Sequence, residues 1–67
     1  MTQSVLLEKF RVDYSEGKGY AIYTKRANGY YRQEVYFNRL GTEIFLEVKK
    51  ISANAYDFAK PHGVIIY

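Results

Sequence analysis

The chain has 67 residues, a formal net charge of +3 and no cysteine. This length predicts a single domain over residues 1–67 with a thin core, because so short a chain buries only about 60% of its unfolded surface. Disulfides are excluded, and a single histidine without thiolates leaves no ligand set for a zinc site. No apolar run approaches the ~20 residues that cross a bilayer, and the first residues lack a signal-peptide pattern, so we expect a cytoplasmic protein.

The first predicted element is a strand over residues 5–14, where apolar and polar side chains alternate through Phe10, Val12 and Tyr14. An amphipathic helix over residues 3–10 is the alternative, because the two leucines and Phe10 also fall on one helical face. The Gly-rich stretch at 15–19 is typical of a turn and predicts the end of this element.

The strongest turn signal is Asn28-Gly29, which lies between two alternating segments. Asn-Gly favours the type I′ turn of a two-residue β-hairpin, so we expect the bend at these two residues. Centred there, the strands oppose Lys25 with Arg32. One face of the hairpin then carries the side chains of a predicted core: Tyr20, Ile22, Val35 and Phe37.

The next turn, at residues 39–42, suits a hairpin loop in which Gly41 supplies the special dihedral. It leads to a predicted strand over 43–51. The alternating apolar side chains of this strand would extend the core face; they are Ile44, Leu46 and Val48.

The end of the chain predicts a short helix and a closing strand. Ser52 can cap a helix over 53–59, which Pro61 and Gly63 would end, and residues 64–67 suit a last strand. The whole order predicts a mostly β fold. It fits a small antiparallel meander, or a five-stranded barrel that resembles the Src-homology type or the OB type.

Residues that could carry catalysis are sparse. His62 lies in a turn signal without a nearby serine or cysteine, which is typical of an exposed turn histidine. The carboxylates have no metal-ligand spacing, and no phosphate-binding Gly pattern is present. A chain this short also has difficulty enclosing a water-excluded pocket. We therefore expect no enzyme, no cofactor and no metal.

Positive charge gathers in the middle of the chain, where residues 18–39 hold five basic residues and one acidic residue. In the predicted register, Lys25, Arg32 and Lys49 form a row of like charges on neighbouring strands, an arrangement that costs stability. A bound phosphate backbone would relieve that cost. The predicted binding residues on or beside this face are Lys25, Arg26, Arg32, Lys49, Tyr23, Tyr30 and Tyr36.

Cations beside aromatic rings favour single-stranded nucleic acid, because bases stack on rings while phosphates meet the cations. The first hypothesis is therefore a regulatory DNA- or RNA-binding module. The second is a protein-binding or inhibitor module, such as a mobile-element or phage-type protein, that docks on an acidic protein surface. The third is a structural homo-oligomer. Against all three stands a solvated face whose lysines prevent aggregation, with tyrosines that pack against a helix or another copy.

Overall fold

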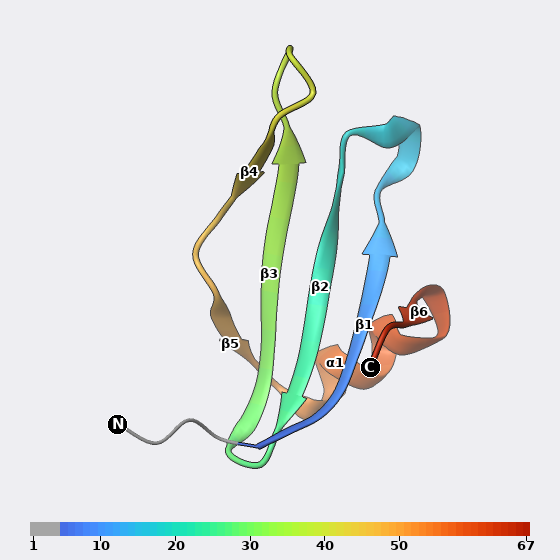
Figure 1. Ribbon diagram of the computed structural model, residues 1–67. Helices are drawn as coiled ribbons and strands as arrows, with labels where there is room; N and C mark the ends of the chain where they lie inside the picture. The colour runs from blue at the N-terminus through green and yellow to red at the C-terminus, as the bar shows by residue number, and fades with distance from the viewer. Residues whose placement is uncertain (1–4) are drawn as a thin grey trace.

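The computed structural model describes residues 5–67, and its elements follow one another as a β meander with a short helix near the end (Figure 1). The strands are β1 (Leu6–Asp13), β2 (Gly19–Arg26), β3 (Gly29–Phe37), β4 (Glu43–Phe45), β5 (Lys49–Ile51) and β6 (Val64–Ile65). The helical segments are η1 (Ser15–Gly17), α1 (Ala53–Ala59) and η2 (Lys60–His62). None of these helices is long and apolar enough to cross a membrane.

The strands form one antiparallel sheet in the order β4-β3-β2-β1-β6, with β5 also paired to β3. The predicted mostly β fold with one short helix is confirmed. Of the two predicted architectures, the meander is found, because no strand pair in residues 5–67 joins β6 to β4 or β5 and closes a barrel.

The first element is the predicted strand, and the alternative of a helix over residues 3–10 is wrong for the described part of that range. β1 pairs with β2 over its whole length, with a bulge between Leu6 and Glu8. Residues 3 and 4 lie outside the part of the chain that the structure describes.

The β2–β3 hairpin bends one residue earlier than predicted, at Ala27-Asn28, and Arg26 is opposite Gly29. Gly29 is the first residue of β3, with a φ of 146° that favours glycine. A Cβ there would lie 3.0 Å from Cε of Lys50, so the glycine also makes room for that side chain. Each β2 residue is therefore opposite the β3 residue two positions before its predicted partner. Because side chains alternate between the two faces of a strand, a shift of two residues keeps those of β2 and β3 on their predicted faces.

The predicted strand over 43–51 is in fact two short strands, interrupted at residues 46–48. β5 keeps the predicted register, with Arg32 opposite Lys49. In β4, however, Val35 is opposite Phe45 and not Leu46, so β4 is shifted by one residue and its side chains change face. The predicted core extension is therefore wrong, and its three side chains are 40–53% exposed: Ile44, Leu46 and Val48.

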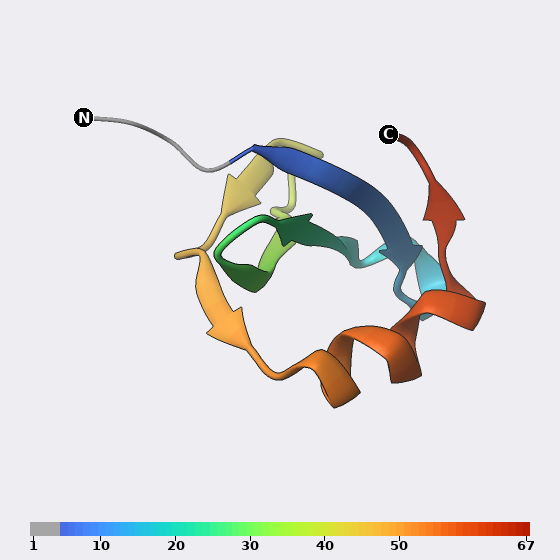
Figure 2. The same cartoon turned by 90° about the horizontal axis from the view of Figure 1, so that it is seen from below.

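α1 has the predicted bounds and the predicted cap, because the Ser52 hydroxyl accepts a hydrogen bond from the Ala55 amide at 3.1 Å. After η2, the chain returns as β6 beside β1. The helix thus runs from one side of the sheet to the other and lies across one of its faces (Figure 2).

The core is small and divided between the two faces of the sheet. Its buried side chains are Phe10, Tyr20, Ala21, Val35 and Tyr56. Tyr20 and Val35 belong to the predicted core face, but Phe37 is 37% exposed and Ile22 is only partly buried. The largest buried cluster lies on the opposite face, where the Phe10 ring meets the helix through Tyr56 at 5.0 Å.

Candidate functional site

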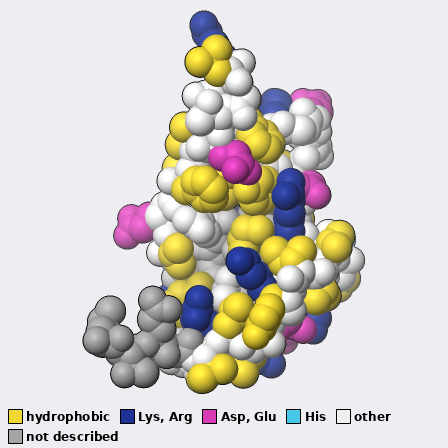
Figure 3. All heavy atoms as spheres, viewed as in Figure 1, with side chains coloured by type: hydrophobic (Ala, Val, Ile, Leu, Met, Phe, Trp, Pro, Cys, Tyr) yellow, Lys and Arg dark blue, Asp and Glu magenta, His cyan; other side chains and the backbone are white. Residues whose placement is uncertain are grey.

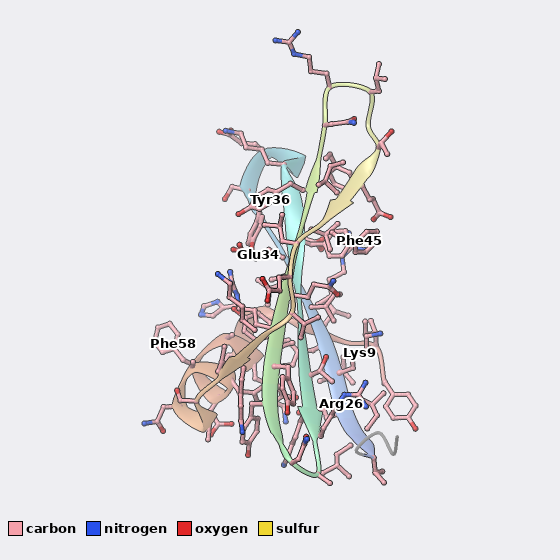
Figure 4. All side chains as sticks on the ribbon, turned by 90° about the vertical axis from the view of Figure 1, so that its left-hand side faces the viewer. Lys9, Arg26, Glu34, Tyr36, Phe45 and Phe58 are labelled. Atoms are coloured by element: carbon pink, nitrogen blue, oxygen red, sulfur yellow. The ribbon has the colours of Figure 1, made fainter. Side chains whose placement is uncertain are left out.

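The register and the position of α1 define two faces of the sheet (Figure 4). The helix face includes Glu8, Phe10, Tyr23, Lys25, Tyr30, Arg32, Glu34, Tyr36 and Lys49. The front face, which is turned to the viewer in Figure 1, includes Lys9, Arg11, Tyr20, Ile22, Thr24, Arg26, Tyr31, Val35, Phe45 and Lys50. Figure 4 separates them: Glu34, Tyr36 and Phe58 point to the side of α1, whereas Lys9, Arg26 and Phe45 point away from it.

The predicted row of three cations is not formed. Arg32 is opposite Lys49, as predicted, but its other neighbour is Tyr23. Lys25 is opposite Tyr30, with its ammonium group 6.0 Å from the centre of that ring. The shift of two residues in the β2–β3 pairing therefore replaces a repulsive contact with a favourable one.

Arg32 belongs to a hydrogen-bonded network on the helix face. Its guanidinium donates to the Glu34 carboxylate at 2.6 Å and to the hydroxyls of Tyr14 and Tyr23 at 3.1 Å each. Tyr14 donates in turn to Glu34 at 2.9 Å. This bond, and the bond from Arg32, hold the pKa of Glu34 below its ordinary value. Arg32 is thus neutralised and oriented within the protein.

Two of the three predicted binding tyrosines are packed beneath α1. Tyr23 stacks on Phe10, with ring centroids 4.9 Å apart and an interplanar angle of 7°. Tyr30 contacts Tyr56 at 4.9 Å between centroids. Tyr36 lies beyond the helix, is 39% exposed and packs against Tyr14 at 5.6 Å. Packing against a helix, the alternative role of these tyrosines, is the one that Tyr23 and Tyr30 have here.

Glu8 connects α1 to the sheet. It accepts a hydrogen bond from the Tyr56 hydroxyl at 2.6 Å and pairs with the Lys60 ammonium group at 2.9 Å. The bond from Tyr56, followed by that from Lys60, lowers the pKa of Glu8. Burial, and then the bond to Glu8, raise the pKa of Tyr56. Glu8 therefore stays ionised and Tyr56 protonated, which keeps this helix contact intact at neutral pH.

The front face carries a row of polar and basic side chains across four strands. Lys9 is opposite Thr24, Thr24 is opposite Tyr31, and Tyr31 is opposite Lys50. Arg26, the fourth of the predicted cations, projects from the same face one step closer to the hairpin bend. Lys9 and Lys50 make no ion pair with any residue of the range 5–67.

The remainder of the front face is largely apolar, with basic side chains beside it (Figure 3). Tyr20 lies opposite Val35, and Val35 lies opposite Phe45, which is 59% exposed. Arg11 covers the Tyr20 ring at 3.8 Å and is itself paired with Asp13 at 2.7 Å. The structure places no second layer over this face in residues 5–67. The front face therefore has a basic end near the hairpin bend and an apolar end near β4.

Lys9, Tyr31 and Lys50 of the front-face row were not among the predicted binding residues. Of the predicted binding residues, only Arg26 shares a face with them. No sequence signal locates them, because both faces offer large side chains to a helix: Phe10 and Tyr23 on one face, and Tyr20 and Val35 on the other. Lys9 and Thr24 lie on the uncovered face as the strand neighbours of Phe10 and Tyr23.

The described residues give no sign of a metal centre, because no group of three His, Asp or Glu side chains in them could hold an ion. His62 is exposed in η2, with its ring 6.3 Å from that of Phe58. No protein-family model, curated protein or solved structure matches this chain.

Proposed function

We propose that the protein is a non-catalytic module that binds single-stranded nucleic acid on the front face of its sheet. The observation that carries this proposal is the row Lys9–Thr24–Tyr31–Lys50, in which two cations without ion-pair partners in residues 5–67 flank an aromatic ring. On the helix side, Arg32 and Lys60 are paired with carboxylates, whereas Lys25 and Lys49 make no ion pair with any described residue. The front-face row differs from these two lysines because its cations lie on either side of the Tyr31 ring.

The spacing of the row fits a chain of phosphates. Neighbouring strands lie ~4.8 Å apart, so the backbones that carry Lys9 and Lys50 are separated by about 14 Å. A single strand that crosses the sheet can meet both ammonium groups, with Arg26 beside them, while one base stacks on Tyr31. The Tyr31 hydroxyl donates to Asn28 at 3.1 Å, which holds this ring near the hairpin bend.

The binding test is a titration of a labelled single-stranded RNA and DNA at two salt concentrations. Three phosphate contacts predict a slope of about −2 in log affinity against log salt, or a roughly 20-fold loss between 50 and 200 mM. The variant with Lys9→Glu, Arg26→Glu and Lys50→Glu should lose binding. Tyr31→Ala should weaken binding by about 5-fold or more through lost stacking and leave the salt slope unchanged.

A matched control carries the same change of charge elsewhere: Lys18→Glu, Lys25→Glu and Lys49→Glu. Lys25 and Lys49 lie on the helix face, so this variant should keep most of the affinity. Equal losses in the two triple variants would mean that net charge alone attracts the ligand. The proposal is also contradicted if neither RNA nor DNA binds, or if binding does not depend on salt.

A module that binds an acidic protein surface is the second candidate. It is favoured by the exposed apolar side chains along the β3–β4 ribbon and the segment that follows, which are Tyr36, Phe37, Ile44, Phe45, Leu46 and Val48. Poly-glutamate of matched charge separates the two candidates. Equal affinity for poly-glutamate and RNA, with no effect of Tyr31→Ala, would favour the acidic protein.

A further inference from the structure

The outer edge of β6 is apolar and unprotected. β6 and the two residues that follow it carry four consecutive side chains without charge: Val64, Ile65, Ile66 and Tyr67, which are 66%, 52%, 49% and 66% exposed. β6 ends the sheet next to β1, and no other described strand pairs with its outer side. An edge of this kind is a template for pairing with another strand.

The opposite edge of the same sheet is protected. β4 and β5 carry charged side chains at Glu43, Lys49 and Lys50, and the chain is interrupted between them at residues 46–48. Charges and irregularities are the usual means by which sheet edges avoid association. Of the two edges, the β6 edge is the better suited to pairing, because its side chains carry no charge and its backbone is uninterrupted.

We propose that β6 pairs with β6 of a second copy of this chain, antiparallel and about a two-fold axis. The backbone directions fit this arrangement. The Ile66 amide donates inward to the Lys9 carbonyl at 2.9 Å, so strand alternation directs the N–H and C=O of the preceding residue, Ile65, outward. Ile65 can then exchange both bonds with Ile65 of the second copy, which places the axis at this residue.

The side chains of such a pair are complementary. Val64 would lie opposite Ile66 of the other copy on the front face, and the two Ile65 side chains would meet on the helix face. On the front face, Lys9 lies beside Ile66 and Arg11 is opposite Val64, so Lys9 of one copy would lie in line with Arg11 of the other. These two cations are separated by three strand spacings, about 14 Å, which exceeds the Debye length of ~8 Å at physiological salt.

The contact is small, which sets the expected affinity. A standard interface buries about 800 Å² on each partner, and an edge of four residues supplies less. We therefore expect a weak dimer with a dissociation constant of roughly 10–100 μM, formed without any change in the monomer fold. With the two-fold axis at Ile65 perpendicular to the sheet, the two sheets would form one continuous sheet, and the two front faces would lie on the same side of it.

Sedimentation velocity over about 5 μM to 1 mM tests the dimer, and that range spans the expected constant. The wild type should shift from monomer to dimer. Ile65→Lys and Ile65→Glu should each remain monomeric, because like charges would meet at the axis. An equimolar mixture of the two variants should dimerise again, which a merely unfolded variant could not do.

Ile44→Lys on the opposite edge is the matched control, and it should dimerise as the wild type does. The Ile65 amide should exchange slowly with deuterium only at high protein concentration. A wild type that stays monomeric to 1 mM would overturn the proposal, as would a dimer that Ile44→Lys abolishes or a mixture that fails to associate. No nucleic acid is present in these measurements, so their outcome is independent of the proposed function.

Discussion

On the helix face, Arg32 and Glu8 are held by hydrogen bonds to neighbouring side chains, whereas the two lysines of the front-face row have no such partners among the described residues. Arg32 binds a carboxylate and two tyrosine hydroxyls, and Glu8 binds both Tyr56 and Lys60. Lys9 and Lys50 make no ion pair with any described residue. A cation that is hydrogen-bonded to tyrosines contributes to the stability of the fold, while a cation without such bonds is available to a ligand.

The contrast shows why residue type alone did not locate the proposed binding surface. Both faces contain lysine, arginine and tyrosine. What separates them is the helix, because Tyr56 turns one set of rings into a core. Substitutions on the helix face should therefore change stability, and substitutions in the front-face row should change binding.

The largest effect is expected for Tyr56→Ala. Loss of this buried ring should cost about 3–5 kcal/mol of the free energy of unfolding. A core of this size rarely supplies more than ~5 kcal/mol, so the variant should be largely unfolded by circular dichroism. Tyr56→Phe keeps the ring and loses only the bond to Glu8, and it should fold with a loss of about 1–2 kcal/mol. A fully stable Tyr56→Ala would refute the assignment of the core.

A smaller effect is expected for Arg32→Gln, which removes the charged bonds to Glu34 and to two tyrosines. We expect a loss of about 1.5–3 kcal/mol in urea unfolding. Lys9→Gln on the front face is the matched substitution and should change stability by less than ~0.5 kcal/mol. Equal losses in the two variants would remove the distinction between the faces.

The smallest expected effect is the loss of folding stability at low pH. Folding lowers the pKa of Glu8 and of Glu34, so their stabilisation is complete above the unfolded value near 4.5 and is lost as the pH falls through the folded pKa. Glu8→Gln should cost about 1 kcal/mol at neutral pH and should weaken this acid dependence. Urea unfolding from pH 7 to about pH 3 measures both. Glu47→Gln, at an exposed position between β4 and β5, should retain the full dependence.

Local signals in the sequence predicted the elements that depend on neighbouring residues. The cap at Ser52 and the break at Pro61 are such signals, and α1 has the predicted bounds. The register of the β2–β3 hairpin was harder to predict, because Asn28 can occupy either position of a two-residue turn. Gly29 enters β3 beside Lys50, a contact that no local pattern contains.

Prediction of the face that α1 covers required contacts between residues that are far apart in the chain. Residues 46–48 alternate normally in sequence, so the interruption between β4 and β5 was not visible there. The covered face is decided by Tyr56, whose partner Glu8 is 48 positions away. Pattern reasoning on adjacent strands predicted the two sets of side chains, but it could not decide which set α1 covers.

The pairing of Tyr56 with Glu8 also has a consequence during synthesis. Phe10 leaves the peptidyl-transferase centre well before the helix that covers it, and at about 5–20 residues per second that interval lasts several seconds. The β1–β2–β3 meander is built from contacts between segments that are adjacent in the chain, whereas the contact of Tyr56 with Phe10 joins distant ones. The aromatic face of the meander is therefore covered only after α1 has been synthesised.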